Sequence, residues 1–238
     1  MLKDYSRLTK LNEIKKGQTG TGLLIENDGH IIPPTSTISQ IKEDINNGSK
    51  FVIPDDFIVS AVFQKYGVKN ANGRIYPENV LRTQVDKYIR ERVNTRCAIG
   101  SLDHPQATTL SGHDVAMNIL NLEWQGRTLI GEMKLHISPG YKKYGICSTS
   151  GDLVANMLLD NILIGVSSRG VGTVRPEGDV TIVDDDYDII CWDVVCEPST
   201  PNAFIKFNRS ELQPFIESKE NGNNSLNEKL SRMESILI

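Results

Sequence analysis

The chain has 238 residues, of which 39% are hydrophobic and 24% are charged, so it can bury one good core and still carry appendages. Its formal net charge of −4 argues against nucleic acid or an anionic membrane as the main partner. No apolar run approaches the roughly 20 residues that span a bilayer, and the first residues lack the apolar core of a signal peptide. We therefore expect no membrane partner and a protein that stays in the cytosol where it is made.

The first half of the chain divides into an extension and the start of a domain. Residues 1–50 are polar and broken by glycine and proline, which predicts an extension that is removable or that docks on the rest of the chain. The predicted domain covers residues 51–208. Alternating apolar residues over 57–63 indicate a half-buried strand, and an Asn-Gly pair at 72–73 indicates a turn. Pro77 opens a predicted helix that runs to about Val93, since the first helical turn tolerates a missing N–H.

The second half of the chain alternates strands with one helix. Strands are predicted over 115–123 and 128–137, joined by a Gln-Gly turn at 125–126. A helix follows over 152–162 with Asp152 as its N-cap, and three further strands are centred on Ser167, Thr181 and Ile190. Residues 209–238 indicate a flexible linker and a C-terminal amphipathic helix.

The predicted fold class is α+β. Strands outnumber helices and are mostly joined by turns, which favours an antiparallel or mixed sheet. We expect a closed β-barrel of mostly antiparallel strands, surrounded by a few helices.

Two hydroxyl groups stand between glycines in the segment 165–170, which reads Gly-Val-Ser-Ser-Arg-Gly at a predicted helix-to-strand junction. A turn there exposes a serine nucleophile, and the flanking glycines let backbone N–H groups approach a reacting carbonyl. The same letters also suit an ordinary turn or a phosphate-binding loop. Side chains of adjacent strand residues point to opposite faces, so only one of Ser167 and Ser168 can face a general base.

Two other segments contain side chains that can bind and release protons. His104 directly precedes Pro105, which favours an extended backbone and gives the imidazole a defined direction. Asp193 follows an apolar strand over 189–192, where an unpaired carboxylate would be costly. Each also has an ordinary explanation, because histidines are common in surface loops and Asp193 also fits the outward position of an alternating strand.

Four segments, taken in order, resemble the prohead core proteases of contractile-tailed phages: 70–77, 100–105, 165–172 and 193–199. The resemblance runs from about Phe57 to Phe204, and this family is similar in fold and mechanism to herpesvirus assemblin. It implies an assemblin-like barrel and a serine endopeptidase that trims phage scaffold and major capsid proteins inside the immature prohead, in the host cytoplasm. Ser101 departs from the family pattern, which commonly has Glu at that position.

The resemblance also implies roles for the candidate residues. Ser167 matches the nucleophile, His104 the catalytic histidine and Asp193 the third, orienting member. His113 is the reserve candidate for the third role, because assemblin itself uses a second histidine there.

Three neighbours of Ser167 are expected to support it or to compete with it. Ser168 is the competing nucleophile. The N–H groups near Arg169 and Gly170 would stabilise the oxyanion, with help from the Arg169 guanidinium. That guanidinium suits a structural salt bridge equally well.

No metal or other cofactor is expected. The four cysteines form no Cys-x-x-Cys pair and are predicted to be reduced thiols. A zinc site or a cysteine nucleophile beside His104 is imaginable, but the spacing of zinc ligands is missing.

Two further expectations concern processing and the alternative function. The resembled family tends to cut after Glu in an aliphatic-x-Glu sequence, which predicts self-processing after Glu13, Glu26 or Glu228. The alternative is a non-catalytic capsid or scaffold assembly module on the same barrel, and against it stands the joint presence of all three candidate groups. Whether the chain forms a homo-oligomer stays open.

Overall fold

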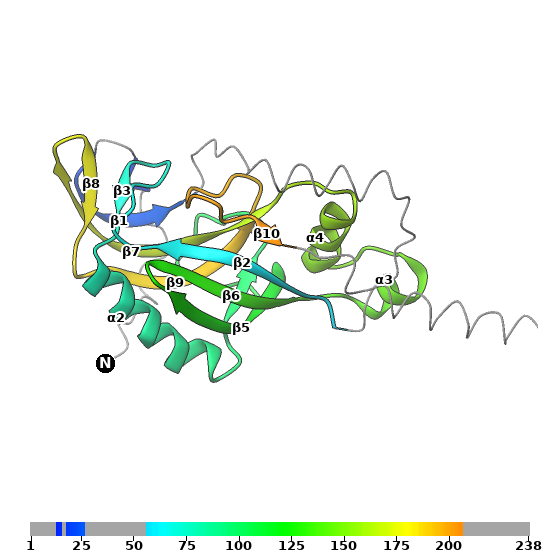
Figure 1. Cartoon of the computed structure of the whole chain (residues 1–238). Helices are drawn as coiled ribbons and strands as arrows, with labels where there is room; N and C mark the ends of the chain where they lie inside the picture. Colours follow the sequence, from blue (N-terminus) through cyan, green and yellow to red (C-terminus); the bar gives the residue numbers. More distant parts are fainter. Residues whose placement is uncertain (1–12, 16–17, 27–55, 207–238) are drawn as a thin grey trace, which may run out of the picture.

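The computed structural model describes residues 13–15, 18–26 and 56–206, and the strands of this part form two sheets (Figure 1). The first is a 5-stranded sheet of β1 (Gly20–Ile25), β7 (Gly165–Glu177), β8 (Val180–Val183) and β3 (Arg74–Ile75), with β9 (Asp188–Val195) also paired to β7. The second 5-stranded sheet runs in the order β10 (Ile205–Lys206), β2 (Ile58–Lys65), β6 (Thr128–Leu135), β5 (Val115–Gln125) and β4 (Ile99–Ser101).

The strand pairing supports the predicted fold class at the level of α+β. All strand pairs are antiparallel except β3 with β8, which is parallel. Within the described residues the pairing makes two separate sheets and no closed cylinder, so the closed barrel stays a prediction.

The predicted hairpin over 115–137 is confirmed as β5 and β6. Its turn contains Gly126, whose φ of 59° lies in the left-handed region that glycine adopts without a steric penalty. Along β6, Leu129, Met133 and Leu135 are buried and alternate with more exposed neighbours, so this strand turns an apolar face to the core.

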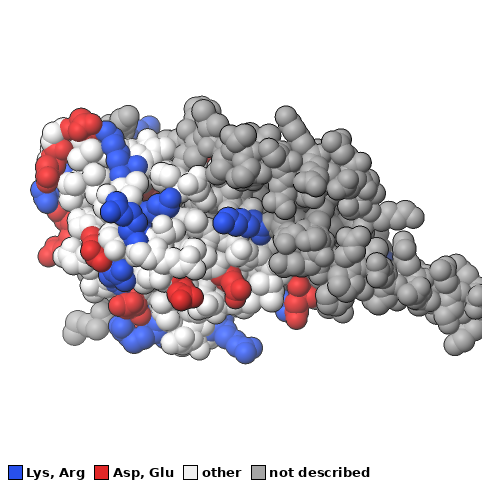
Figure 2. Space-filling model, viewed as in Figure 1, with Lys and Arg blue, Asp and Glu red and all other residues white. Residues whose placement is uncertain are grey.

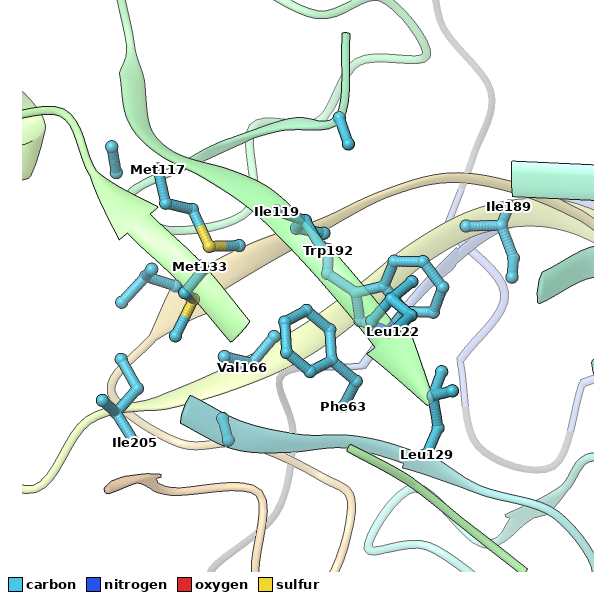
Figure 3. Packing of buried hydrophobic residues seen from close by; sticks show 14 of the residues in the cluster. Phe63, Met117, Ile119, Leu122, Leu129, Met133, Val166, Ile189, Trp192 and Ile205 are labelled. Carbon is cyan, nitrogen blue, oxygen red and sulfur yellow. The ribbon is translucent and has the colours of Figure 1, made fainter. Parts of the chain in front are cut away.

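The main core lies between the two sheets (Figure 3). Trp192 of β9 is at its centre, in edge-on contact with Phe63 of β2 at a centroid distance of 5.7 Å and with Tyr88 at 4.9 Å. Tyr88 ends α2 (Glu78–Tyr88), which continues as a π-helical turn, η1 (Ile89–Val93). The helix predicted from Pro77 to about Val93 is therefore confirmed, and it covers one side of this core.

Two short helices, α3 (Pro139–Tyr144) and α4 (Ser150–Leu159), lie together at one end of the molecule (Figure 1). The prediction that Asp152 is the N-cap of the second helix was wrong, because Thr149 holds that position. The Thr149 hydroxyl accepts from the Asp152 N–H at 3.1 Å, and the Asp152 carboxylate accepts from the Thr149 N–H at 3.0 Å. A carboxylate suits either end of such a capping box, and only the geometry shows which residue ends the extended chain.

The expected N-terminal extension contains a strand of the first sheet. β1 pairs with β7 from Gly20↔Val174 to Ile25↔Arg169, so residues 20–25 form one edge of the sheet that carries the candidate nucleophile. The linker and helix expected over 209–238 lie outside the described residues. The division into 1–50, 51–208 and 209–238 stays a prediction.

Candidate active site

Strands β7 and β9 together present two chemically different faces. Ser167 stands directly opposite Asp193 in their antiparallel register, and Arg169 stands opposite Cys191. Directly opposed residues project to the same side of a sheet, so these four side chains share one face. Ser168 stands opposite Trp192, whose ring fills the main core, so Ser168 belongs to the other face.

The segment expected to be an exposed turn is instead the beginning of a buried strand. β7 starts at Gly165, and the side chains of Ser167 and Ser168 lie inside the protein, with only 1% and 3% of each residue exposed. The expectation failed because glycine and serine are typical of turns, whereas here they are paired with β9, and Gly165 also forms a bridge to Phe204.

His104 reaches this face through the loop after β4. Leu102 forms a bridge to Val194, and the Asp103 N–H donates to the Val194 carbonyl at 2.8 Å. Asp103 then has a φ of 62°, which turns the chain at a residue type that tolerates the left-handed region. This turn aims the imidazole at Asp193, with 2.8 Å between His104 Nδ1 and Asp193 Oδ2.

Close packing of β4 on β9 fixes where that loop starts. A Cβ atom on Gly100 would lie 2.1 Å from the Trp192 carbonyl oxygen, so this position has no room for any side chain. The next residue, Ser101, donates its backbone N–H to Asp193 Oδ1 at 2.9 Å. The contact uses only the backbone, which explains why Ser at this position is compatible with the site.

The Asp193 carboxylate is buried, and hydrogen bonds and the positive charge of Arg169 offset the loss of its contact with water. Its side chain and that of His104 are both 0% exposed. Burial by itself raises the pKa of this carboxyl, but the hydrogen bond from His104 and the charge of Arg169 outweigh it and hold the pKa below the ordinary value. Asp193 is therefore an anion at neutral pH and can stabilise a positive charge on the imidazole.

Arg169 joins the Asp193 carboxylate to the loop that carries His104. Its Nε donates to Asp193 Oδ2 at 2.9 Å, and its Nη1 donates to the carbonyl of Ala107 at 2.6 Å and to that of Pro105 at 3.3 Å. The geometry matches the structural salt bridge, which was one of the two roles expected for Arg169. The N–H and C=O groups of Gly170 lie in a strand flanked by β1 and β9.

The second ring nitrogen of His104 and the hydroxyl of Ser167 differ in their hydrogen bonds. His104 Nε2 is buried and has no hydrogen-bond partner among the described residues. The Ser167 hydroxyl makes a short hydrogen bond to the backbone carbonyl of Glu26. His113 lies exposed in another part of the loop region, with its backbone N–H donating to Ser111 Oγ.

The family model for the prohead core protein serine protease matches residues 20–213, which is most of the chain. The chain belongs to this family. It is 27% identical over 162 residues to the prohead core protein protease of Enterobacteria phage T4, covering 67% of this chain and 73% of the relative. The structure of the bacteriophage T4 capsid assembly protease superposes with a TM-score of 0.57 and 24% identity, over 74% of this chain and 98% of the other, and supports the fold.

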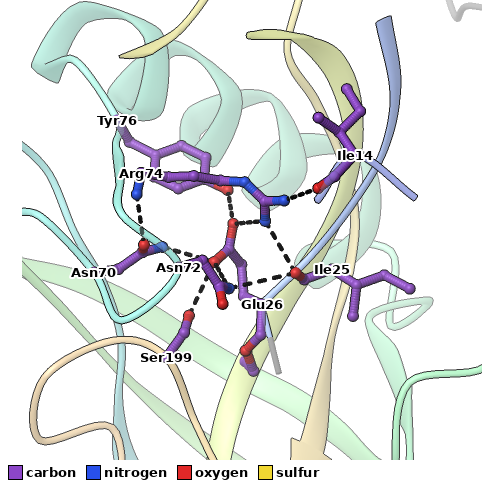
Figure 4. A network of polar contacts seen from close by, with 9 residues as sticks. Ile14, Ile25, Glu26, Asn70, Asn72, Arg74, Tyr76 and Ser199 are labelled. Carbon is purple, nitrogen blue, oxygen red and sulfur yellow. Dashed lines mark hydrogen bonds and ion pairs between the residues drawn. The ribbon is translucent and has the colours of Figure 1, made fainter. Parts of the chain in front are cut away.

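A second buried network in this prohead protease was missed by sequence reasoning (Figure 4). Its centre is the Glu26 carboxylate, in a residue that is only 1% exposed. Five side chains surround it with donors: Arg74 at 2.8 Å and Tyr76 at 2.6 Å from Oε1, and Asn70 at 2.6 Å, Asn72 at 2.6 Å and Ser199 at 3.0 Å from Oε2. Four of these residues lie in the 70–77 segment and one at the end of the 193–199 segment, so the motifs were visible but had no assigned role.

Among residues 13–15, 18–26 and 56–206, no three His, Cys, Asp or Glu side chains gather into a candidate metal site. Basic and acidic side chains are interspersed over the described part of the face in Figure 2. None of the described helices is long and apolar enough to cross a membrane.

Proposed function

We propose that Ser167, His104 and Asp193 form the catalytic triad of this prohead serine protease. The observation that carries the proposal is the His104–Asp193 pair, which leaves Nε2 as the buried, unpartnered nitrogen of an imidazole beside the sheet face that holds Ser167. An orienting carboxylate bound to Nδ1 fixes the proton on that nitrogen and leaves Nε2 as a base.

In the proposed mechanism, His104 Nε2 takes the proton of Ser167 as the oxygen attacks the carbonyl carbon of a peptide. It then gives the proton to the leaving amine, and water hydrolyses the resulting ester by the same route in reverse. Asp193 stabilises the imidazolium. Arg169 holds Asp193 and the His104 loop in register, while the N–H groups around Gly170 remain the proposed support for the oxyanion.

The choice of Ser167 over Ser168 rests on the register. Ser167 shares a face with Asp193, whereas Ser168 stands opposite Trp192 on the core side. Rotating Ser168 to the other face would require a one-residue slip of β7 against β9, which would also expose the apolar face of β7 to the site. The same reasoning favours Asp193 over His113, since Asp193 is already in contact with His104.

Substrates, location and architecture follow from the family membership as proposals. We propose that the chain cleaves phage scaffold and major capsid proteins inside the immature prohead in the host cytoplasm. The assemblin-like barrel is proposed as well, supported by the antiparallel pairing of both sheets and by the core between them.

A serine-reactive fluorophosphonate tests the triad. Full-length protein is expected to be labelled at Ser167, Ser168→Ala is expected to keep the label, and Ser167→Ala is expected to lose it together with cleavage of capsid and scaffold proteins. Label on Ser168 would show that Ser168, and not Ser167, is the nucleophile. Folded protein that takes no label and cleaves no prohead protein would favour the non-catalytic assembly module.

A further inference from the structure

The backbone carbonyl of Glu26 shows how a peptide carbonyl is held beside the proposed nucleophile. Its oxygen accepts hydrogen bonds from two donors, the Ser167 hydroxyl and the backbone N–H of Ser199, the second at 3.3 Å. A carbonyl that a serine attacks gains negative charge on its oxygen, and a donor aimed at that oxygen stabilises the charge. The Ser199 N–H therefore lies within reach of a carbonyl oxygen at the reacting serine.

This N–H group belongs to a buried loop that follows β9. Ser199 is 0% exposed. Its hydroxyl donates to the Glu26 carboxylate at 3.0 Å (Figure 4), and its carbonyl accepts the Ala71 N–H at 3.1 Å. Pro198 directly before it restricts the backbone, because the proline ring fixes φ. A buried donor that is already oriented stabilises developing charge more strongly than a mobile donor in water.

Gly165, the first glycine of the 165–170 segment, allows this loop to approach the nucleophile strand. A Cβ atom on Gly165 would lie 2.4 Å from Pro198 Cγ and 2.5 Å from the Ala203 carbonyl oxygen, so no side chain fits there. Gly165 begins β7 just before Ser167. The close contact therefore fixes the loop against the strand at the position where the nucleophile needs an oxyanion donor.

The Arg169 guanidinium, the charged group expected to support the oxyanion, is engaged elsewhere. Its Nε and Nη2 donate to the Asp193 carboxylate, and Nη2 also donates to Cys191 Sγ at 3.1 Å. Its Nη1 donates to the carbonyls of Ala107 and Pro105. A guanidinium has five N–H groups, and these five contacts use all of them. The charge at the reacting carbonyl therefore needs backbone donors.

We propose that the Ser199 backbone N–H is a catalytic donor that stabilises the oxyanion of this protease, in addition to the N–H groups around Gly170. The inference rests on the proposed triad. As Ser167 Oγ bonds to the carbonyl carbon, an electron pair of the C=O bond moves to the oxygen, and the Ser199 N–H binds that charge. The pair returns as the bond to the leaving nitrogen breaks, and that nitrogen takes the serine proton through His104. The Ser199 proton is not transferred.

Replacement of a single backbone N–H by an ester oxygen tests the donor. Lactic acid, the α-hydroxy acid of alanine, is placed at position 199 of the full-length chain, and the product is compared with Ser199→Ala. Both chains lack the hydroxyl that contacts Glu26, so they differ only in the backbone group. In the ester chain, kcat for a peptide with glutamate before the cut is expected to be about 10²- to 10³-fold lower, with little change in KM.

Lactic acid at position 203 is the matched control. The Ala203 N–H lies in the same loop but donates to the Thr200 carbonyl at 3.1 Å, away from the reacting carbonyl. This ester keeps the alanine side chain and is expected to leave kcat near the wild-type value. Pro198→Ala is the second variant where circular dichroism shows that the ester at 199 does not fold. It frees the backbone before the donor and is expected to lower kcat about 10-fold at unchanged KM.

The outcomes separate the inference from the proposed function. An ester at 199 that keeps the kcat of Ser199→Ala, with fluorophosphonate label on Ser167, would overturn the inference and leave the triad standing. Equal losses of kcat for the esters at 199 and 203 would also overturn it, because weakening of the loop would explain both. Where Pro198→Ala replaces the ester, an unchanged kcat has the same meaning. Cleavage by Ser167→Ala would instead contradict the proposed nucleophile.

Discussion

Two buried carboxylates, Asp193 and Glu26, belong to residues that neighbour Ser167 and share much of their chemistry. Asp193 stands opposite Ser167 in the sheet, and the backbone carbonyl of Glu26 accepts the Ser167 hydroxyl. Each has an arginine partner, Arg169 for Asp193 and Arg74 for Glu26. Burial by itself raises the pKa of each carboxyl, but its partners hold that pKa below the ordinary value. For Asp193 these are first the His104 hydrogen bond and then the Arg169 charge, and for Glu26 first the Arg74 charge and then the Tyr76 hydrogen bond. They differ in their remaining partners. Asp193 holds an imidazole with a free nitrogen, whereas Glu26 is enclosed by donors that have no such second function.

The difference teaches how one kind of buried ion serves two purposes. A carboxylate that orients a titratable group takes part in moving protons, and its loss removes chemistry. A carboxylate whose partners are all fixed donors holds together the segments that supply them, and its loss leaves those buried donors unpaired. Three sets of substitutions and one change of pH test this contrast.

The largest effect is expected for His104→Ala. Removing the proposed base should lower kcat by about 10³ to 10⁶, since the members of a serine-protease triad act as a unit. The measurement is the rate of cleavage of a peptide with glutamate before the cut. His113→Ala is the control and should stay near wild type. Comparable losses in both variants would return His113 to the site.

Asp193→Asn should lower kcat by about 10⁴, because an amide neither fixes the same tautomer nor stabilises the imidazolium. The structure adds a cost in stability, since Arg169 would be left as an uncompensated buried charge, typically about 3–5 kcal/mol. Urea unfolding followed by tryptophan fluorescence measures the second effect. A folded variant with unchanged turnover would remove Asp193 from the triad.

The two faces of β9 should respond differently to truncation. Trp192→Ala is expected to lower the free energy of unfolding by about 3–5 kcal/mol, because the ring contacts Phe63 and Tyr88 inside the main core. Cys191→Ala, on the other face, is expected to cost only about 1 kcal/mol. Equal losses in denaturant midpoints would mean that the site face is packed as a core.

The smallest effect concerns acid. Glu26 and Asp193 have folded-state pKa values below their ordinary values of 4.5 and 3.8, so both bind protons more weakly when folded than when unfolded. Their contribution to stability is present above the ordinary values and is lost as the pH falls through the lower, folded ones. Urea midpoints measured at decreasing pH should therefore fall below about pH 4, and less steeply in Glu26→Gln. A midpoint independent of pH in that range would contradict the two depressed values.

Sequence reasoning was most successful where local chemistry decides the outcome. The hairpin of β5 and β6 was predicted from alternation and a turn glycine, and α2 from periodicity after Pro77. It failed at α4, where Thr149 and Asp152 share the capping box, and at β7, where turn-like letters form a buried strand. At α4 two neighbouring residues fit the same cap, whereas at β7 the partner that decides the conformation, β9, lies elsewhere in the chain.

The candidate groups of the site can be found without a structure, because Ser167, His104 and Asp193 are chemically distinctive and lie in motifs whose order identifies the family. Tertiary structure alone decided how they meet. The register of β7 against β9 sets Ser167 across from Asp193 and turns Ser168 toward the core. It also brought Glu26 from the first 50 residues into contact with Arg74, a separation that no local pattern reports. The physical reason is that local letters limit backbone conformation, whereas contacts between distant strands depend on packing and on the burial of charge across the whole domain.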